Sequence, residues 1–171
     1  MSGDKVQPIA SAEVIAPNPA ESIPQILAEL AEHETRFTER FYEIFFEARP
    51  DARPLFGTHA LAEQEEMMRE TLHSLLAWAE SEPWLEGNLS ALGKSHWEYG
   101  VTADMYASFI ESMLECGNEV IGESLDADQR AVLRSALEFV AYQMRDAGDA
   151  AEAADTRLKN SRSEIAIKAS G

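Results

Sequence analysis

The sequence lacks the features that define several classes of protein. Cys116 is its one cysteine, so no disulfide can form within the chain. No apolar run approaches the roughly 20 residues of a transmembrane helix, and no glycine-rich dinucleotide-binding loop is present. The N-terminus has no basic segment followed by an apolar one, so the sequence predicts no signal peptide. We therefore expect a cytoplasmic protein without a flavin or nicotinamide site of its own.

Basic residues are also few. The chain has 14 Lys and Arg against 31 Asp and Glu, which gives a formal net charge of -17. A surface of this sign repels the phosphates of nucleic acids and the head groups of anionic lipids. We therefore expect neither nucleic acid nor membrane as a partner.

The apolar residues recur at helical spacing, and no segment alternates with the period of two that strands require. The 171 residues suffice for one domain with a sizeable core. The pattern predicts an all-α domain of about seven helices over residues 22–147. Residues 1–21 contain prolines and small residues without periodicity, which indicates a flexible N-terminal extension. Residues 148–171 form a C-terminal tail that we expect to be helical in part.

One histidine lies on an apolar stripe. Leu85, Leu89, Leu92 and His96 follow each other at intervals of four, three and four residues, so they share one face of a helix. The three leucines would bury this face and direct the imidazole into the interior. A buried neutral imidazole can serve as an axial iron ligand in a haem pocket. It can equally be a hydrogen-bonded core residue, and the stripe by itself leaves both interpretations open.

Several short motifs occur together and in a fixed order. They are Phe41-Tyr42, Pro50-Asp51-Ala52-Arg53-Pro54-Leu55-Phe56, Gln64 ahead of Met67-Met68, Leu92-Gly93-x-x-His96-x-x-Tyr99-Gly100-Val101, and Tyr106. Over residues 22–147 the chain resembles bacterial globins, in particular the single-domain haemoglobins and the haem domain of flavohaemoglobins. The resemblance implies a globin fold with about seven helices around a haem pocket. Since no Cys-x-x-Cys-His motif is present, we expect a non-covalent b-type haem (iron protoporphyrin IX).

The resemblance assigns roles to individual residues. His96 matches the proximal histidine that binds the iron, and Phe56 matches the phenylalanine that stacks on the haem plane. Tyr42 matches the distal tyrosine whose hydroxyl hydrogen-bonds oxygen on the iron. Gln64 matches the distal glutamine, and Met68 the apolar residue over the iron. The alternatives are a hydrophobic plug for Phe56 and a core tyrosine with a backbone partner for Tyr42.

Further residues complete the haem-binding set that the resemblance implies. Phe46, Leu92, Val101, Tyr106 and Phe109 match positions on the pocket wall or beside the proximal histidine. The register around Gln64 is less well fixed than the rest, because residues 57–66 contain no internal anchor. A slip of a few residues would bring Glu63 or His59 near the site instead.

One position departs from the flavohaemoglobin pattern. In those proteins a carboxylate from the last helix polarises the proximal histidine and is held by a tyrosine, and Tyr106 fits that tyrosine. The matching glutamate is absent: its position falls near Gly148, and Asp146 and Asp149 are the nearby candidates to replace it. A carboxylate partner strengthens the histidine as a donor, so its loss weakens the case for oxygen activation.

The resemblance therefore predicts a protein that reversibly binds oxygen, and also nitric oxide or carbon monoxide, with His96 as the metal ligand. We assign no catalytic residue. Two alternatives remain open: a nitric oxide dioxygenase served by an external reductase, and a globin-fold module for gas sensing or signalling. The sequence does not distinguish a monomer from a homodimer.

Overall fold

Every regular element of the described chain is helical. The computed structural model describes residues 18–122 and 125–169, which contain six α-helices and one short 3-10 helix. The elements are α1 (Pro19–Ala31), α2 (Glu34–Ala48), the 3-10 helix η1 (Pro50–Leu55), α3 (Ala60–Ala79), α4 (Leu85–Tyr99), α5 (Ala103–Val120) and α6 (Ala127–Ala169). The predicted all-α class is confirmed. Most of the predicted extension over residues 1–21 lies outside the described residues.

The helices begin and end at residues suited to those positions. α1 begins three residues before the expected Ser22, because Pro19 occupies its first turn and the Asn18 side chain accepts a hydrogen bond from the backbone N–H of Ala20 at 3.2 Å. α6 begins after Asp126, whose carboxylate accepts the backbone N–H of Gln129 at 2.8 Å. The Gln129 side chain accepts the N–H of Asp126 in return, which forms a capping box.

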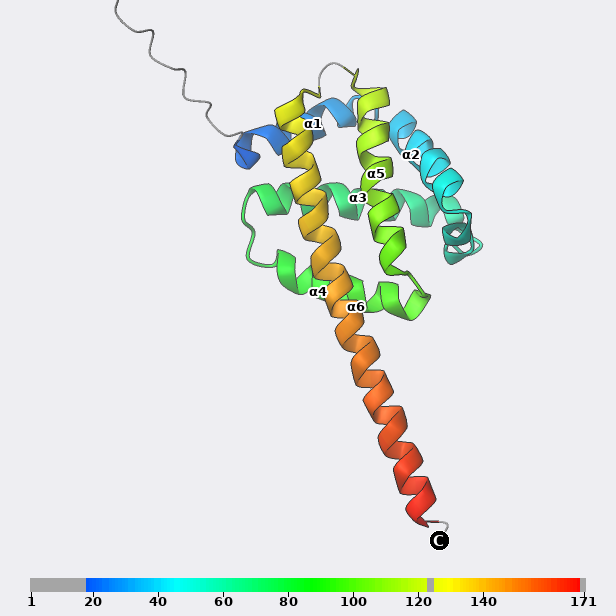
Figure 1. Cartoon of the computed structure of the whole chain (residues 1–171). Coiled ribbons are helices and arrows are strands. Elements are labelled where there is room, and N and C mark those ends of the chain that lie inside the picture. Colours follow the sequence, from blue (N-terminus) through cyan, green and yellow to red (C-terminus); the bar gives the residue numbers. More distant parts are fainter. Residues whose placement is uncertain (1–17, 123–124, 170–171) are drawn as a thin grey trace, which may run out of the picture.

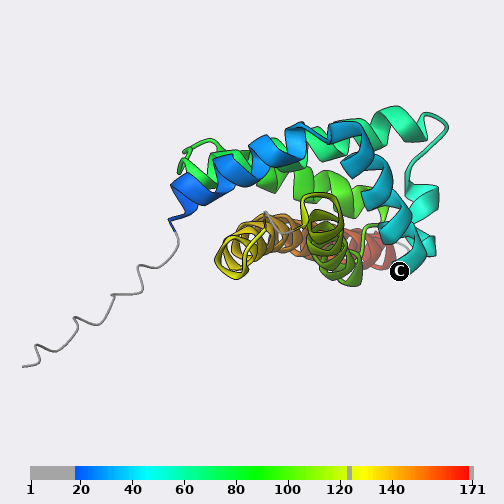
Figure 2. The same ribbon diagram turned by 90° about the horizontal axis from the view of Figure 1, so that it is seen from above.

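The helices pack in two groups. Figure 1 shows α5 and α6 side by side, with α3 and α4 crossing behind them. Viewed from above, α5 and α6 lie together on one side of the molecule, and α1 with α3 lies on the other (Figure 2). α4 packs against α6 and α2 against α5. The 3-10 helix lies against the end of α2, where Pro50 prevents that helix from continuing.

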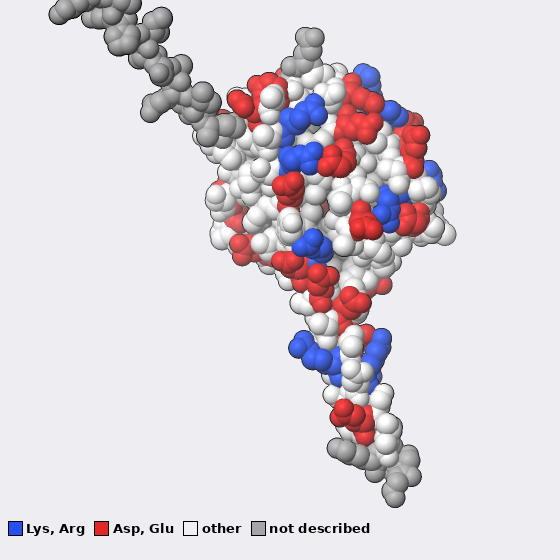
Figure 3. Space-filling model, in the orientation of Figure 1, with Lys and Arg blue, Asp and Glu red and all other residues white. Residues whose placement is uncertain are grey.

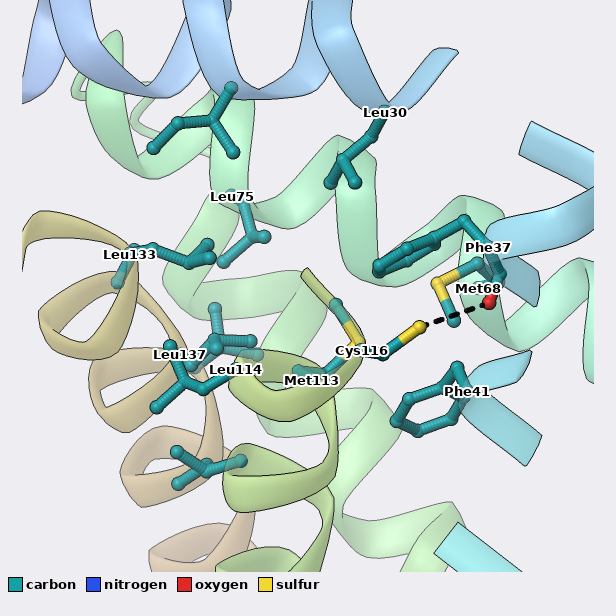
Figure 4. Close-up of a cluster of buried hydrophobic side chains, with 14 of the residues drawn as sticks. Leu30, Phe37, Phe41, Met68, Leu75, Met113, Leu114, Cys116, Leu133 and Leu137 are labelled. Carbon is teal, nitrogen blue, oxygen red and sulfur yellow. Dashed lines mark hydrogen bonds between the residues drawn. The ribbon is translucent and has the colours of Figure 1, made fainter. Parts of the chain in front are cut away.

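The core is built from the apolar faces that the sequence pattern predicts. Phe37 and Phe41 of α2 meet Met113 and Cys116 of α5, and Leu133 approaches from α6 (Figure 4). All five of these side chains are buried. The thiol of Cys116 donates a hydrogen bond to the carbonyl of Phe37 at 3.4 Å, so its one polar group is satisfied. Burial of each large side chain contributes roughly 1.5–3 kcal/mol, and this cluster therefore holds α2, α5 and α6 together.

α6 extends far past the rest of the structure. It has 43 residues, or about 65 Å at the usual helical rise, and its last turns project from the packed helices (Figure 1). Among the helices of residues 18–122 and 125–169, none is long and apolar enough to cross a membrane.

Candidate functional site

The stripe that ends at His96 lies on α4 as its spacing predicts. Leu85 and Leu89 are buried, and Leu92 and His96 are half-buried. The helix ends one turn later, where Gly100 adopts the left-handed conformation with φ of 89°. The backbone N–H of Val101 then donates to the carbonyl of His96 at 2.9 Å. The end of α4 is thus fixed directly beside the histidine.

One nitrogen of the His96 imidazole is hydrogen-bonded, and the other keeps its lone pair available. Its Nδ1 lies 2.8 Å from the carbonyl oxygen of Leu92, one helical turn earlier. A carbonyl only accepts hydrogen bonds, so Nδ1 is the donor, and the lone pair of the neutral ring is on Nε2. Burial lowers the pKa of His96 below its ordinary value of 6.5, although the hydrogen bond to Leu92 opposes this shift. The neutral form, which can bind a metal, is therefore favoured near pH 7.

Two glycines let α4 approach α6 at backbone distance. A Cβ atom built on Gly93 would lie 2.0 Å from the carbonyl oxygen of Met144, and one on Gly148 would lie 3.3 Å from the carbonyl oxygen of Gly93. Since no side chain separates the two helices here, the position of α4 is set by the backbone of α6. The sequence pattern does not predict this contact, because each glycine is informative only once the two helices are known to cross.

Tyr106 of α5 lies next to His96, as the resemblance predicts. The two ring centroids are 6.2 Å apart and the ring planes differ by 29°. Burial raises the pKa of Tyr106 to about 12, and the negative charge of Asp149 adds to the shift. The carboxylate of Asp146 instead lies 3.6 Å from Arg145. That Asp149 takes the place of the missing glutamate stays a prediction.

A second group of predicted residues forms an aromatic cluster between α2 and the loop after η1. The rings of Tyr42, Phe46 and Phe56 are 5.4–5.5 Å from each other, and Phe56 meets both of the others edge to face. Such contacts contribute about 0.5–1.5 kcal/mol beyond the area they bury. The guanidinium of Arg53 lies 4.6 Å above the ring of Phe46 and covers the outside of the cluster. Phe56 is thus held in place by its aromatic neighbours.

The hydroxyl of Tyr42 joins α2 to α3. It donates to the backbone carbonyl of Gln64 at 3.0 Å, and its side chain is almost completely buried. Burial raises the pKa of Tyr42 above its usual range, so the hydroxyl keeps its proton and acts as a donor. The two residues predicted for the distal side therefore meet, but through the backbone of Gln64. This is the partner expected of a core tyrosine.

The start of α3 shows which of the side chains near Gln64 face the interior. The carboxylate of Glu63 accepts the backbone N–H of Gly57 at 2.8 Å, so it faces back to the loop. His59 is exposed at the N-terminal end of the helix. Gln64 is half-buried, and Met68, one turn later, is buried beside Phe37 (Figure 4). Gln64 and Met68 thus face the interior where Glu63 and His59 do not.

The remaining predicted residues belong to the core packing. The ring of Phe109 lies 4.8 Å from that of Phe41 and 5.8 Å from that of Phe45. Val101 and Leu92 are half-buried and pack against the same core. These three side chains help to position α4 and α5 whatever the site binds.

A groove of about 570 Å³ lies on a different part of the surface. It runs between α2, α5 and α6, and its lining includes Ile44, Ala107, Glu111 and Tyr142. Neither His96 nor Phe56 lines it. Of the predicted haem-binding residues, Tyr106 alone lines this groove.

The residues present fit a haem. His96 offers one imidazole nitrogen with a free lone pair, and Phe56 is a fixed aromatic ring. In residues 18–122 and 125–169 no group of three or more His, Cys, Asp or Glu could hold a metal ion. A haem iron takes its in-plane ligands from the porphyrin, so one such imidazole is a sufficient protein ligand.

Comparison with known proteins supports the resemblance. Residues 39–144 match the family model described as Globin. No curated protein matches the chain. Among solved structures, a protein from Pseudomonas aeruginosa PAO1, described as structurally highly homologous to a human haemoglobin, aligns with a TM-score of 0.67 and 22% identity over 76% of this chain and 98% of its own. A bacterial globin from Campylobacter jejuni aligns with a TM-score of 0.62 and 17% identity over 77% and 94%.

Proposed function

Because this chain belongs to the globin family, which implies a haem cofactor, we propose that it holds one non-covalent b-type haem through Nε2 of His96 and reversibly binds oxygen. Nitric oxide and carbon monoxide are the further ligands of this proposal. One observation supports it above the others: Nδ1 of His96 donates to Leu92 at 2.8 Å, which leaves Nε2 as the free lone pair. The haem iron, when bound, supplies the coordination site for the gas.

The proximal residues hold the imidazole in one orientation. The hydrogen bond to Leu92 selects the tautomer and fixes the rotation of the ring. The ring of Tyr106 limits its movement on one side. The contact at Gly93 and Gly148 sets the distance between α4 and α6, and therefore the position of α4. We infer that His96 binds the metal without a large rearrangement of α4.

On the distal side we propose that Tyr42 donates a hydrogen bond to the gas ligand. Its single hydroxyl proton is directed to the carbonyl of Gln64, so donation elsewhere requires the O–H to rotate away. The cost of rotation is small, because a carbonyl at that position of α3 also accepts a hydrogen bond within the helix, from the N–H four residues on. The net contribution to oxygen binding is then the difference between two hydrogen bonds, which is less than a whole one.

The visible absorption spectrum of the purified, haem-loaded protein tests this proposal. We expect His96→Ala to lose stoichiometric haem or to show a changed ferrous spectrum, and added imidazole to restore the signal in part. His33→Ala is the matched control, because His33 is exposed between α1 and α2. A His96→Ala protein with an unchanged ferrous spectrum would show that His96 is not the ligand.

A second candidate function is nitric oxide dioxygenase activity supported by an external reductase. It is favoured by the negative charge of Asp149, which together with burial raises the pKa of Tyr106, the residue that matches the tyrosine of the proximal pair. Under this candidate, sustained nitrate formation requires a separate reductase and decreases in Asp149→Asn. If the protein only binds gas reversibly, nitrate formation is slow and Asp149→Asn leaves its rate unchanged. Sustained turnover with NADH and the purified protein alone would contradict both, since the sequence offers no nicotinamide site.

A further inference from the structure

The end of α6 leaves most of its described side chains exposed. Gly148 is the last of the described residues of α6 to be buried, and we call residues 149–169 the arm. The arm projects from the other helices (Figure 1) and bears both acidic and basic groups (Figure 3). Leu158 and Ile165 on it are 60% and 68% exposed. Most of the stability of a helix in a protein comes from packing of its apolar face, so a face of this kind gains from being covered.

The apolar face of the arm continues the core-facing stripe of α6. Within the body, Leu133, Leu137, Val140 and Met144 are buried and follow at intervals of four, three and four. The same alternation continues as Ala147, Ala151, Ala154, Leu158, Ser161 and Ile165. We call the last four of these, Ala154, Leu158, Ser161 and Ile165, the seam. An alternation of three and four is the heptad pattern by which two helices pack along their length.

The charges beside the seam favour one orientation of a partner helix. Asp155 and Arg162 lie on one flank, directly after the seam positions 154 and 161. Arg157 and Glu164 lie on the other flank, directly before 158 and 165. Each flank thus has one residue of each sign, seven residues apart. Flanking charges of this kind set the orientation of a coiled coil.

We propose that two copies of this chain associate by antiparallel packing of their arms along the seam. In the register that places Leu158 opposite Ser161 of the second copy, Ile165 lies opposite Ala154 of the second copy. Large and small side chains therefore alternate across the seam, which allows close packing. By symmetry each contact occurs twice.

The same register pairs opposite charges. Asp155 meets Arg162 of the second copy, and Arg157 meets Glu164 of the second copy, so four ion pairs form in the dimer. Asp155 also has Lys159 as a partner in its own helix, at 2.7 Å. A parallel arrangement would instead place Arg157 against Arg162 of the second copy. Exposed ion pairs contribute little to affinity, but like charges in contact oppose the parallel orientation.

Sedimentation equilibrium on the full chain tests the seam. We expect a mass of twice the 18.9 kDa chain at high protein concentration. Leu158→Ser should raise the dissociation constant at least about tenfold, since a leucine is lost in each copy. Ile167→Ser is the matched control, because Ile167 is 74% exposed but lies off the seam, and it should change nothing. A monomeric wild-type protein, or equal effects of the two variants, would overturn the proposal.

A charge reversal tests the orientation. Arg162→Glu places like charges at Asp155 of the second copy in the antiparallel arrangement, so we expect dimerisation to weaken by about three- to tenfold. The double variant Asp155→Lys with Arg162→Glu should restore it. In a parallel dimer Arg162→Glu would meet Arg157 and strengthen association, which would refute the antiparallel register. Neither outcome depends on haem, so the test is independent of the proposed function.

Discussion

Gly93→Ala is the substitution that most directly probes how the fold positions His96. The added Cβ would lie 2.0 Å from the carbonyl oxygen of Met144, a backbone atom that cannot rotate away. Real Cβ atoms essentially never approach closer than 3.0 Å, so α4 and α6 must separate by about 1 Å. His96 is three residues further along α4, so it shifts with the helix.

The magnitude follows from this geometry. Forcing extra volume into a well-packed contact costs about 1–3 kcal/mol, and alanine returns about 0.5–1 kcal/mol through its higher helix propensity. We expect the free energy of unfolding to fall by about 1–2 kcal/mol. Denaturant unfolding of the apo protein measures that change, and the rate of haem transfer to an acceptor protein should rise in the same variant, because α4 carries the proposed iron ligand.

Gly87→Ala is the control for this prediction. Gly87 lies on the same helix, and a Cβ built there would meet nothing within 4 Å. Its replacement should therefore stabilise the protein by about 0.5–1 kcal/mol and leave haem transfer unchanged. If Gly93→Ala behaved like Gly87→Ala, the close crossing of α4 and α6 would not be what fixes His96.

Two further predictions concern single hydroxyl and thiol groups. Tyr42→Phe removes the hydrogen bond to the carbonyl of Gln64, so the free energy of unfolding should fall by about 1 kcal/mol. Oxygen release should become about three- to tenfold faster, with a smaller effect on the release of carbon monoxide. Unchanged oxygen release would mean that the hydroxyl stays on Gln64. Burial raises the pKa of Cys116 to about 12, so the thiol stays protonated well above neutral pH. Its alkylation at pH 8 should follow unfolding of the protein, and rapid modification of the folded protein would contradict the packing of α5 against α2.

The sequence by itself determined the helices and the candidate iron ligand. Apolar spacing is a local property, so the stripes on α2, α3 and α4 could be recognised without knowing what they pack against. Proline and glycine end helices for reasons that also act within a few residues, as Pro50 and Gly100 show. His96 stood out because three leucines share its face. The order of the motifs pointed to the globin family, and the family match confirmed it.

Tertiary structure decided what depends on contacts between distant segments. Whether Tyr42 donates to a ligand or to Gln64 depends on how closely α3 approaches α2. Asp146 and Asp149 are equivalent candidates in the sequence, but in the structure Asp146 lies beside Arg145, and the charge of Asp149 contributes to the raised pKa of Tyr106. Gly93 and Gly148 are 55 positions apart in the sequence, and neither alone indicates a close contact. The crossing of α4 and α6 shows that no side chain fits between the two helices at these positions. Spacing along one helix determines which face is apolar, but the rotation and separation of two packed helices result from the whole core.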